Sequence, residues 1–437
     1  MFWEIQNQPS ILAWSCKAQN AECKTQIESR REIFFGFSLR KLENLVHYNG
    51  LNAKCQICGI LKVLDNHRVT ERIQEKISVT LWFIFCEKHS MNFPLSPVRV
   101  GVIGAGIGRQ HLRGYQNVSG AIVTAICDLD TRLAAQLAAE NGIEAQIFSD
   151  YRALLDANCV DAVSLCVPNF LHATVALACL ENGLHVLCEK PLAINAIEAQ
   201  QIADAATKNE RVCMVGQVLR FRDDVLALKA EIESGAVGEI YYARAMARRT
   251  QGIPKWGGWF TQQKLAGGGP LIDTGVHILD LAWWLSGCPR PISASGTSYA
   301  KFGPRKLGLG AGGAAIEDGV FDVEDLAAGI VRFENGLSIH FEAAWAIHAA
   351  KDERFCHLHG TEGAILWDDA PKIIDQNGII TPISAQGGDA WTREMAHFIA
   401  CIQNGTAPDP DAGQGVVMMQ ILDALAQSAR EETEVKI

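Results

Sequence analysis

A carboxylate and an imidazole, groups suited to acid–base chemistry, lie four positions apart in one apolar segment. Asp273 and His277 belong to LIDTGVHILDLAWWL (271–285), whose apolar residues predict a buried helix. Residues four apart share one face of a helix, so this carboxylate would orient the imidazole and raise its basicity. The same pair is common on exposed helices without any function. A buried ionisable pair needs a reason, and general acid–base chemistry is one.

A third reactive group is Lys190, in the segment CEKP (188–191) directly after the apolar run 184–188. A lysine before proline is usually a solvated loop residue. Ligands of parallel sheets, however, bind beyond the carboxyl ends of the strands. An ammonium group in that place can donate to a hydroxyl group and stabilise a developing alkoxide.

Three glycines, Gly104, Gly106 and Gly108, follow the apolar run 98–103, which predicts a buried strand. Glycines after such a strand allow a tight turn and let the backbone approach a pyrophosphate at the start of a helix. The third glycine comes one residue earlier than in G-x-G-x-x-G. A glycine cluster alone would often be only a turn, so the surrounding elements decide its meaning.

Asp128 ends the next predicted strand, 121–127, and stands 24 residues after Gly104. An acid at that place accepts hydrogen bonds from the adenosine ribose and repels a 2′-phosphate, which favours NAD over NADP. Asp128 could instead cap the helix predicted over 131–141, although Asp130 is better placed for that role. Arg132 keeps NADP open.

Strands and helices alternate regularly after residue 98, which predicts a doubly wound parallel sheet of the Rossmann type. We predict further strands at 162–167, 184–188 and 212–215 and helices at 151–157, 171–182 and 194–209. The second half predicts an α+β domain with a large, open, mixed or antiparallel sheet. Its strands are expected at 240–248, 291–299, 327–333, 337–345, 355–359 and 364–367, and its helices at 223–234, 391–404 and 415–430. The predicted domains are 97–217 for the dinucleotide and 218–437 for substrate and oligomer contacts.

The first 90 residues differ in composition from the rest of the chain. They contain 12 basic and 9 acidic residues, whereas the net charge of the whole chain is −10. We interpret residues 1–96 as a poorly ordered extension, dispensable and translated from a start codon upstream of the natural one. Cys55, Cys58, Cys86 and His89 could bind zinc, but the long gap between the two pairs favours incidental cysteines. We assign no metal here, nor at the later histidines.

The composition, 437 residues with 48% hydrophobic and 20% charged side chains, excludes a disordered or fibrous chain. The negative charge argues against a nucleic-acid partner. The longest apolar run, 77–86, is about half the length of a membrane span. We expect no secretory leader, and the 14 scattered cysteines predict a reducing cytoplasm.

Four segments together resemble the glucose–fructose oxidoreductase / inositol dehydrogenase (Gfo/Idh/MocA) family. They are GVIGAGIGRQH (101–111), VPNFLH (167–172), CEKP (188–191) and GGGPLIDTGVHILD (267–280), and the resemblance runs from about Val98 to the C-terminus. It implies an enzyme that transfers a hydride between NAD(P) and a secondary alcohol of a sugar, inositol or related polyol. It also implies that Lys190, Asp273 and His277 are the catalytic set, and that the chain forms a homodimer or homotetramer.

Position and resemblance together give the remaining candidate residues. The cofactor candidates are Gly104, Gly106, Ile107, Gly108, Arg109, Asp128, Pro168, Asn169, His172, Glu189, Lys190 and Gln217. The substrate candidates are Lys190, Arg220, Trp256, Trp259, Asp273 and His277. Both tryptophans could equally be core residues or dimer contacts. The alternative function is a nucleotide-binding sensor or scaffold without turnover, against which the intact catalytic set argues.

Overall fold

The computed structural model describes residues 96–310, 315–384 and 387–437. The extension up to residue 95 lies outside the described residues, and so do the candidate zinc ligands Cys55, Cys58, Cys86 and His89. Within the described ranges, no group of three acidic, histidine or cysteine side chains is arranged to hold a metal ion. No helix in this part of the chain is both long and apolar enough to span a bilayer.

The first sheet has six parallel strands in the order β3-β2-β1-β4-β5-β6. The strands are β1 (Val98–Ile103), β2 (Ala121–Cys127), β3 (Gln146–Phe148), β4 (Ala162–Leu165), β5 (His185–Glu189) and β6 (Cys213–Gly216). The order reverses between β1 and β4, so the carboxyl ends of these two strands form the switch point at which such sheets bind ligands. The predicted Rossmann sheet is confirmed.

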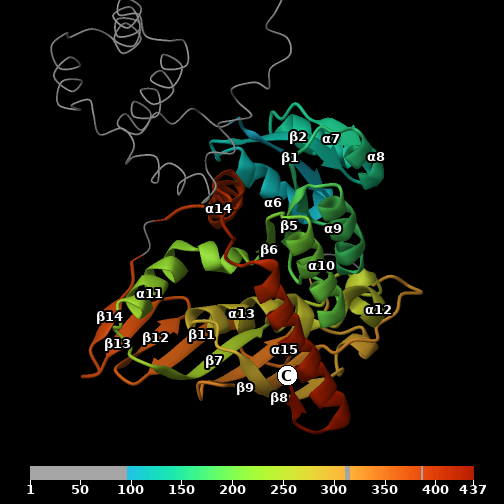
Figure 1. The fold of residues 1–437 in the computed structure, drawn as a ribbon. Coiled ribbons are helices and arrows are strands. Elements are labelled where there is room, and N and C mark those ends of the chain that lie inside the picture. The colour runs from blue at the N-terminus through green and yellow to red at the C-terminus, as the bar shows by residue number, and fades with distance from the viewer. Residues whose placement is uncertain (1–95, 311–314, 385–386) are drawn as a thin grey trace, which may run out of the picture. The chain divides into compact units, whose positions relative to one another are not determined.

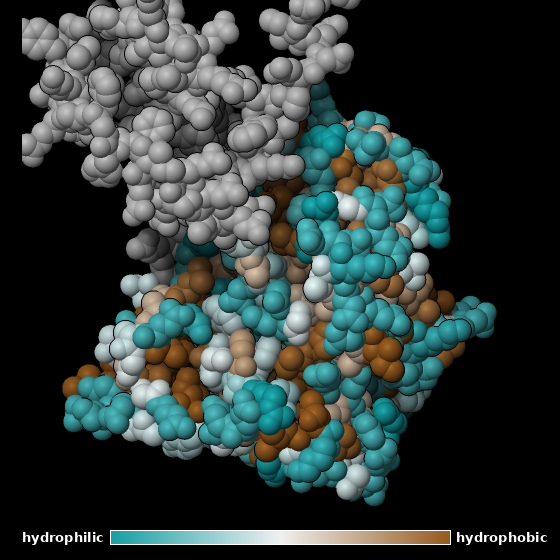
Figure 2. All heavy atoms as spheres, viewed as in Figure 1, coloured by the Kyte–Doolittle hydropathy of each residue, from teal (hydrophilic) through white to brown (hydrophobic). Residues whose placement is uncertain are grey.

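Helices connect these strands and cover the sheet (Figure 1). They are α6 (Ala105–Tyr115), α7 (Thr131–Glu140), α8 (Tyr151–Asp156), α9 (His172–Glu181) and α10 (Ala196–Lys208). In the view of Figure 2, hydrophilic residues cover most of the outer surface of α7 to α10. Their opposite sides are apolar because strands buried on both faces need apolar partners.

The second sheet has nine strands in the order β14-β13-β12-β11-β7-β10-β9-β8-β15. They are β7 (Ile240–Arg248), β8 (Pro291–Tyr299), β9 (Leu326–Phe333), β10 (Ser338–Ala344), β11 (Glu353–Gly360), β12 (Gly363–Trp367), β13 (Lys372–Asp375), β14 (Ile380–Pro382) and β15 (Val435–Lys436). Only β7 and β10 pair in parallel; the other neighbours are antiparallel. The predicted mixed sheet is therefore confirmed as well.

One face of the nine-stranded sheet, here called the inner face, packs against helices. The helices of this half are α11 (Asp223–Glu233), α12 (Gln263–Ala266), α13 (Val276–Leu285), α14 (Ala390–Asn404) and α15 (Ala412–Glu431). Of these, α13 packs on β7, β10 and β11, and α15 packs on β8 and β9. Phe341, for example, points to this face and contacts Gly275 just before α13.

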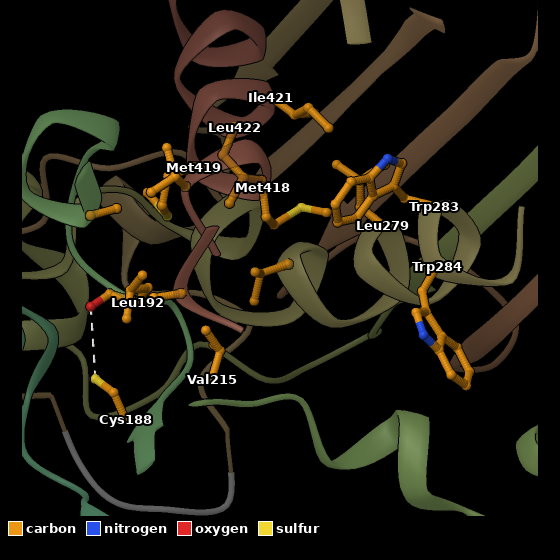
Figure 3. Packing of buried hydrophobic residues seen from close by; sticks show 14 of the residues in the cluster. Cys188, Leu192, Val215, Leu279, Trp283, Trp284, Met418, Met419, Ile421 and Leu422 are labelled. Atoms are coloured by element: carbon orange, nitrogen blue, oxygen red, sulfur yellow. Dashed lines mark hydrogen bonds between the residues drawn. The ribbon is translucent and has the colours of Figure 1, made fainter. Parts of the chain in front are cut away.

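The core is continuous between the two sheets. Met418 and Met419 of α15 belong to the same buried cluster as Leu192 and Val215 of the first half and Trp283 of α13 (Figure 3). Many of these side chains are fully buried, so the cluster excludes water from the ends of both sheets. This shared core fixes Lys190, which follows β5, relative to the helix that contains His277.

Candidate active site

The turn between β1 and α6 is shaped by its glycines. Gly104 has φ of +99°, and a Cβ there would come within 2.3 Å of the Cys166 carbonyl oxygen. A Cβ on Gly106 would meet no atom within 4 Å, so open space lies above the helix start. A Cβ on Gly108 would come within 2.8 Å of Val102, so this glycine serves the packing of helix on strand. Gly108 was expected at the pyrophosphate, but its buried position makes it a packing residue.

Asp128 lies beside this turn. Its Oδ2 accepts a hydrogen bond from the Ala105 N–H at 2.7 Å, and its Oδ1 accepts one from the Asp130 N–H at 2.8 Å. Asp130 accepts from Arg132 N and Leu133 N and so caps α7, as expected. Asp128 is therefore not the cap of α7. Each carboxylate oxygen has a second lone pair for a ribose hydroxyl.

The turn fits the pyrophosphate of a dinucleotide. The N-cap of α6 is Gly104, which has no side chain. Asp128 accepts from the Ala105 N–H, and the next N–H groups and the positive end of the helix dipole lie beside the open space at Gly106. Ile107 is 42% exposed at the same end, and Arg109 donates from Nε to the Gly106 carbonyl oxygen at 3.0 Å.

Lys190 reaches across to the second half of the molecule. Its Nζ donates to Asp273 Oδ1 at 3.1 Å and to the Asp273 carbonyl oxygen at 3.0 Å. The side chains are 16% and 21% exposed, so the ion pair is mostly shielded but reachable. The structure thus brings together two residues that are 83 positions apart in the chain.

The segment that contains Asp273 is a π-helical turn, Leu271–Gly275, which continues into α13. The sequence predicted a regular α-helix here, with Asp273 and His277 on one face. Asp273 and His277 are still close enough for each charge to act on the other, but no hydrogen bond joins the two side chains among the described residues. Instead, Asp273 Oδ2 accepts from Trp345 Nε1 at 2.9 Å. Such π-helical turns often occur at functional sites.

Glu324 holds the start of this turn. Its Oε1 accepts from the N–H groups of Gly269 at 2.9 Å and Leu271 at 3.0 Å. A Cβ on Gly269 would come within 2.0 Å of the Glu324 carbonyl oxygen, so the glycine run is needed for this close approach. Burial raises the pKa of Glu324.

The charges around the site act on Asp273 and His277 in opposite directions. Burial raises the pKa of Asp273, but Lys190 and the Trp345 donor outweigh it, so the pKa lies below its usual value. Burial and the positive charges of Lys190, Arg354 and Arg249 hold the pKa of His277 well below its usual value, although Asp273 opposes them. At neutral pH, Asp273 is therefore ionised and the imidazole is neutral. The Nδ1 atom of His277 is enclosed and has no hydrogen-bond partner in the described part of the chain.

Glu189 lies beneath the dinucleotide turn and is buried. Its Oε1 is 3.0 Å from His111 Nε2 on α6, and its Oε2 accepts from the Lys190 N–H at 3.2 Å. Glu394 of α14 is also fully buried, and burial together with the charge of Glu189 raises its pKa well above the usual value. Glu189 thus joins α6 to the lysine, and its predicted contact with the cofactor stays a prediction.

The residues after β4 have structural contacts of their own. The ring nitrogens of His172 lie 2.7 Å from the Pro191 carbonyl oxygen and 2.9 Å from that of Val167. His172 is 1% exposed, so it holds the Lys190–Pro191 loop rather than contacting a cofactor, contrary to our expectation. Asn169 is buried and donates to the Ala266 carbonyl oxygen, which ties this strand end to α12. Gln217 is also buried, and its Oε1 has no partner among the described residues; Pro168 is half-buried.

Two residues predicted to bind substrate have other roles. Arg220 is 1% exposed and donates to Asp280 at 2.6 and 2.8 Å, and to Asp409 and Gln414 at 2.6 Å. Its guanidinium is fully engaged inside the protein. Trp256 is buried and donates from Nε1 to the Gly303 carbonyl oxygen at 2.7 Å, so it is a core residue.

Trp259 remains a substrate candidate. It is half-buried and stacks on Phe260, with the ring centroids 3.7 Å apart.

Sequence reasoning missed Trp345 and Glu324, which hold the segment of Asp273. Trp345 is the last residue of the strand predicted over 337–345, and its position at a strand end was the available signal. Nothing in the local sequence of Glu324 indicated its contact with the glycine run.

Comparison with known proteins assigns the chain to a family. Residues 98–217 match the model "Oxidoreductase family, NAD-binding Rossmann fold", and residues 225–366 match the "GFO/IDH/MocA C-terminal domain". D-glucoside 3-dehydrogenase of Escherichia coli is 35% identical over 352 residues, which cover 78% of this chain and 98% of the relative. An inositol 2-dehydrogenase of Corynebacterium glutamicum is 29% identical and covers 74% of this chain and 90% of its own length.

Solved structures agree. A levoglucosan dehydrogenase in complex with NADH superposes with a TM-score of 0.71 at 26% identity, covering 78% of this chain and 99% of the other. The chain belongs to the Gfo/Idh/MocA family and is an NAD-dependent dehydrogenase that acts on CH–OH groups. The predicted family, fold, enzyme class and NAD cofactor are therefore confirmed.

Proposed function

We propose that the protein oxidises a secondary alcohol of a sugar, inositol or related polyol, with Lys190, Asp273 and His277 as its catalytic set. The observation that supports this most directly is the 3.1 Å ion pair between Lys190 and Asp273. It brings an ammonium group from the carboxyl end of β5 to a carboxylate beside α13. The names of the relatives, which include glucoside, inositol and levoglucosan dehydrogenases, support the substrate class.

When bound, NAD accepts the hydride from the alcohol carbon. The residues of this chain supply position and proton transfer. An ammonium group has three donors, and Lys190 gives two of them to Asp273. The third can donate to the alcohol oxygen and lower the cost of negative charge there. His277 is neutral at physiological pH, so it can accept the hydroxyl proton.

Asp273 orients Lys190 rather than the imidazole. Both of its oxygens are engaged, Oδ1 by Lys190 and Oδ2 by Trp345. Its negative charge also opposes the depression of the His277 pKa. In this proposal the carboxylate balances the charge that His277 gains on accepting a proton, without a hydrogen bond between the two.

A panel of sugars and polyols with NAD, followed by the absorbance of the reduced nicotinamide, tests the proposal. We expect Lys190→Met and His277→Ala each to lower kcat by about 100-fold or more, typical of lost acid–base or oxyanion groups. NAD affinity, measured by calorimetry, should stay within a few-fold. Lys208→Met, at an exposed position of α10, is the matched control and should retain full activity. Unchanged rates in both site variants would contradict the proposed catalytic set.

We also propose that the chain forms a homodimer or homotetramer through the outer face of the nine-stranded sheet. Helices α13 and α15 pack on the inner face. The outer face has a cavity of about 400 Å³ whose lining includes Arg244, His340 and Glu342. Such a surface would suit contact with a second copy.

A further inference from the structure

Two arginines lie on the inner face of the nine-stranded sheet, next to the proposed catalytic residues. Residues directly opposite each other in a sheet share a face, and Arg354 of β11 lies opposite Ala247 of β7, which lies opposite Ala343 of β10. The neighbouring row, two residues along each strand, contains Phe341, which contacts Gly275 before α13. Arg354 therefore points to the side of the sheet where α13 and His277 lie.

Arg249 continues the same alternation. It follows Arg248 at the end of β7, and its N–H donates to the Ala344 carbonyl oxygen at 3.0 Å. Arg249 is thus beside Trp345, whose indole donates to Asp273. Both arginines are close enough to His277 for their charges to lower its pKa. The end of the sheet beside the catalytic set is therefore strongly cationic.

The two guanidinium groups have no acidic partner within ion-pair distance in the described ranges. Their neighbours do: Arg248 pairs with Glu342 and Glu353 on the outer face, and Arg222 pairs with Asp224 at 2.7 Å. Of the acids near these arginines, Asp352 accepts from Thr250, and Asp224 accepts from Arg222 and Trp367. Asp369 acts on Arg354 from beyond ion-pair distance.

Arg354 is also held in an orientation that suits an anion. Its guanidinium carbon lies 5.2 Å from the ring centroid of Trp367. A guanidinium stacked on an aromatic ring keeps its N–H groups at its edges for a bidentate contact with a carboxylate or phosphate. Both side chains are exposed, so a ligand can reach them.

We propose that Arg249 and Arg354 bind an anionic group, a carboxylate or a phosphate ester, on the sugar that this enzyme oxidises. This inference rests on the proposed function and makes the substrate class narrower. Two like charges without a carboxylate partner, beside a third cation in Lys190, repel one another until an anion joins them. An anion there fixes one end of the sugar while a hydroxyl at the other end meets Lys190 and His277.

The test compares glucose, glucuronate and glucose 6-phosphate, which share a ring and differ in charge. Calorimetry on the NAD-loaded full-length protein measures binding independently of turnover. We expect glucuronate or glucose 6-phosphate to bind at least about 10-fold more tightly than glucose, since hydrogen bonds to charged groups are roughly twice as strong as neutral ones. Which of the two binds more tightly distinguishes a carboxylate from a phosphate.

Arg354→Gln and Arg249→Gln should each remove most of this preference and leave glucose affinity within about 3-fold, because a neutral sugar makes no charged contact there. Arg244→Gln is the matched control, because Arg244 of β7, like Arg354, lies over an aromatic ring, that of Phe355 of β11, but on the outer face. Equal or weaker binding of both anions than of glucose overturns the inference, as does an equal loss in the Arg244 variant. Arginine-dependent binding without any hydride transfer would uphold this inference and contradict the proposed function.

Discussion

Replacing Trp345 by phenylalanine isolates one hydrogen bond of the proposed catalytic site. The indole is fully buried and donates to Asp273 Oδ2 at 2.9 Å. Phenylalanine keeps an aromatic ring but removes the donor. A hydrogen bond to a charged group contributes about 1.5–3 kcal/mol, and about 1.4 kcal/mol corresponds to tenfold. If the transition state loses the whole free energy of this hydrogen bond, kcat/KM falls by about 10- to 100-fold.

The matched control is Trp256→Phe. Trp256 belongs to the same small buried cluster as Trp345 and also donates from Nε1, but to the Gly303 carbonyl oxygen. Both variants lose the same atoms from the same core, so both should lose some stability. Only Trp345→Phe should lower kcat/KM strongly, measured as NADH formation with the best sugar of the panel.

The pH profile separates a positioning role from a packing role. The Trp345 donor helps to hold the pKa of Asp273 below its usual value, so its removal raises that pKa. Asp273 then loses its charge at a higher pH, and the acidic limb of kcat/KM should move upward in Trp345→Phe alone. Equal losses of kcat/KM in the two variants, with superimposable pH profiles, would refute a role for this hydrogen bond.

Two further predictions concern the cofactor turn and the core. Asp128→Ala should weaken NAD more than NADP, measured by calorimetry, because the carboxylate that accepts from the ribose and repels a 2′-phosphate is lost; the opposite preference would reverse the assignment of the cofactor. Arg220→Met should lower the free energy of unfolding by about 3–5 kcal/mol, because it leaves the buried carboxylate of Asp280 unpaired. Urea denaturation measures this loss, and Arg220→Met combined with Asp280→Asn should recover part of it; equal stability of the single and double variants would show that the charge pair is not its cause.

The sequence predicted best where a local pattern determines the structure. Val98–Ile103 forms the expected strand and leads into glycines that the turn requires, since Gly104 adopts φ of +99°. Asp130 caps α7 as its type and place predict. These features depend on a few neighbouring residues and the backbone, and so they can be derived without knowledge of the fold.

The roles of single polar side chains were harder to predict because their partners are distant in the chain. Arg220 bonds to Asp409, which is 189 positions away, and no sequence spacing shows such a contact. His172 holds a loop through two carbonyl oxygens, although a histidine at a strand end also suits a cofactor. The four-residue spacing correctly placed Asp273 near His277, since each charge acts on the other. It did not show that Lys190 and Trp345 hold the carboxylate, because these partners are 83 and 72 positions away.

Arg248 and Arg249 show what additional information the fold supplies. They are adjacent in sequence, and Arg248 is the last residue of the strand predicted over 240–248. Successive side chains of a strand point to opposite faces, so Arg248 meets Glu342 and Glu353 on the outer face. Arg249, one position later, lies on the inner face near His277. The composition shows only two equal positive charges. In the folded sheet, Arg248 is paired with two acids, whereas the charge of Arg249 acts on His277, the proposed base. An anionic substrate is the partner that this asymmetry predicts.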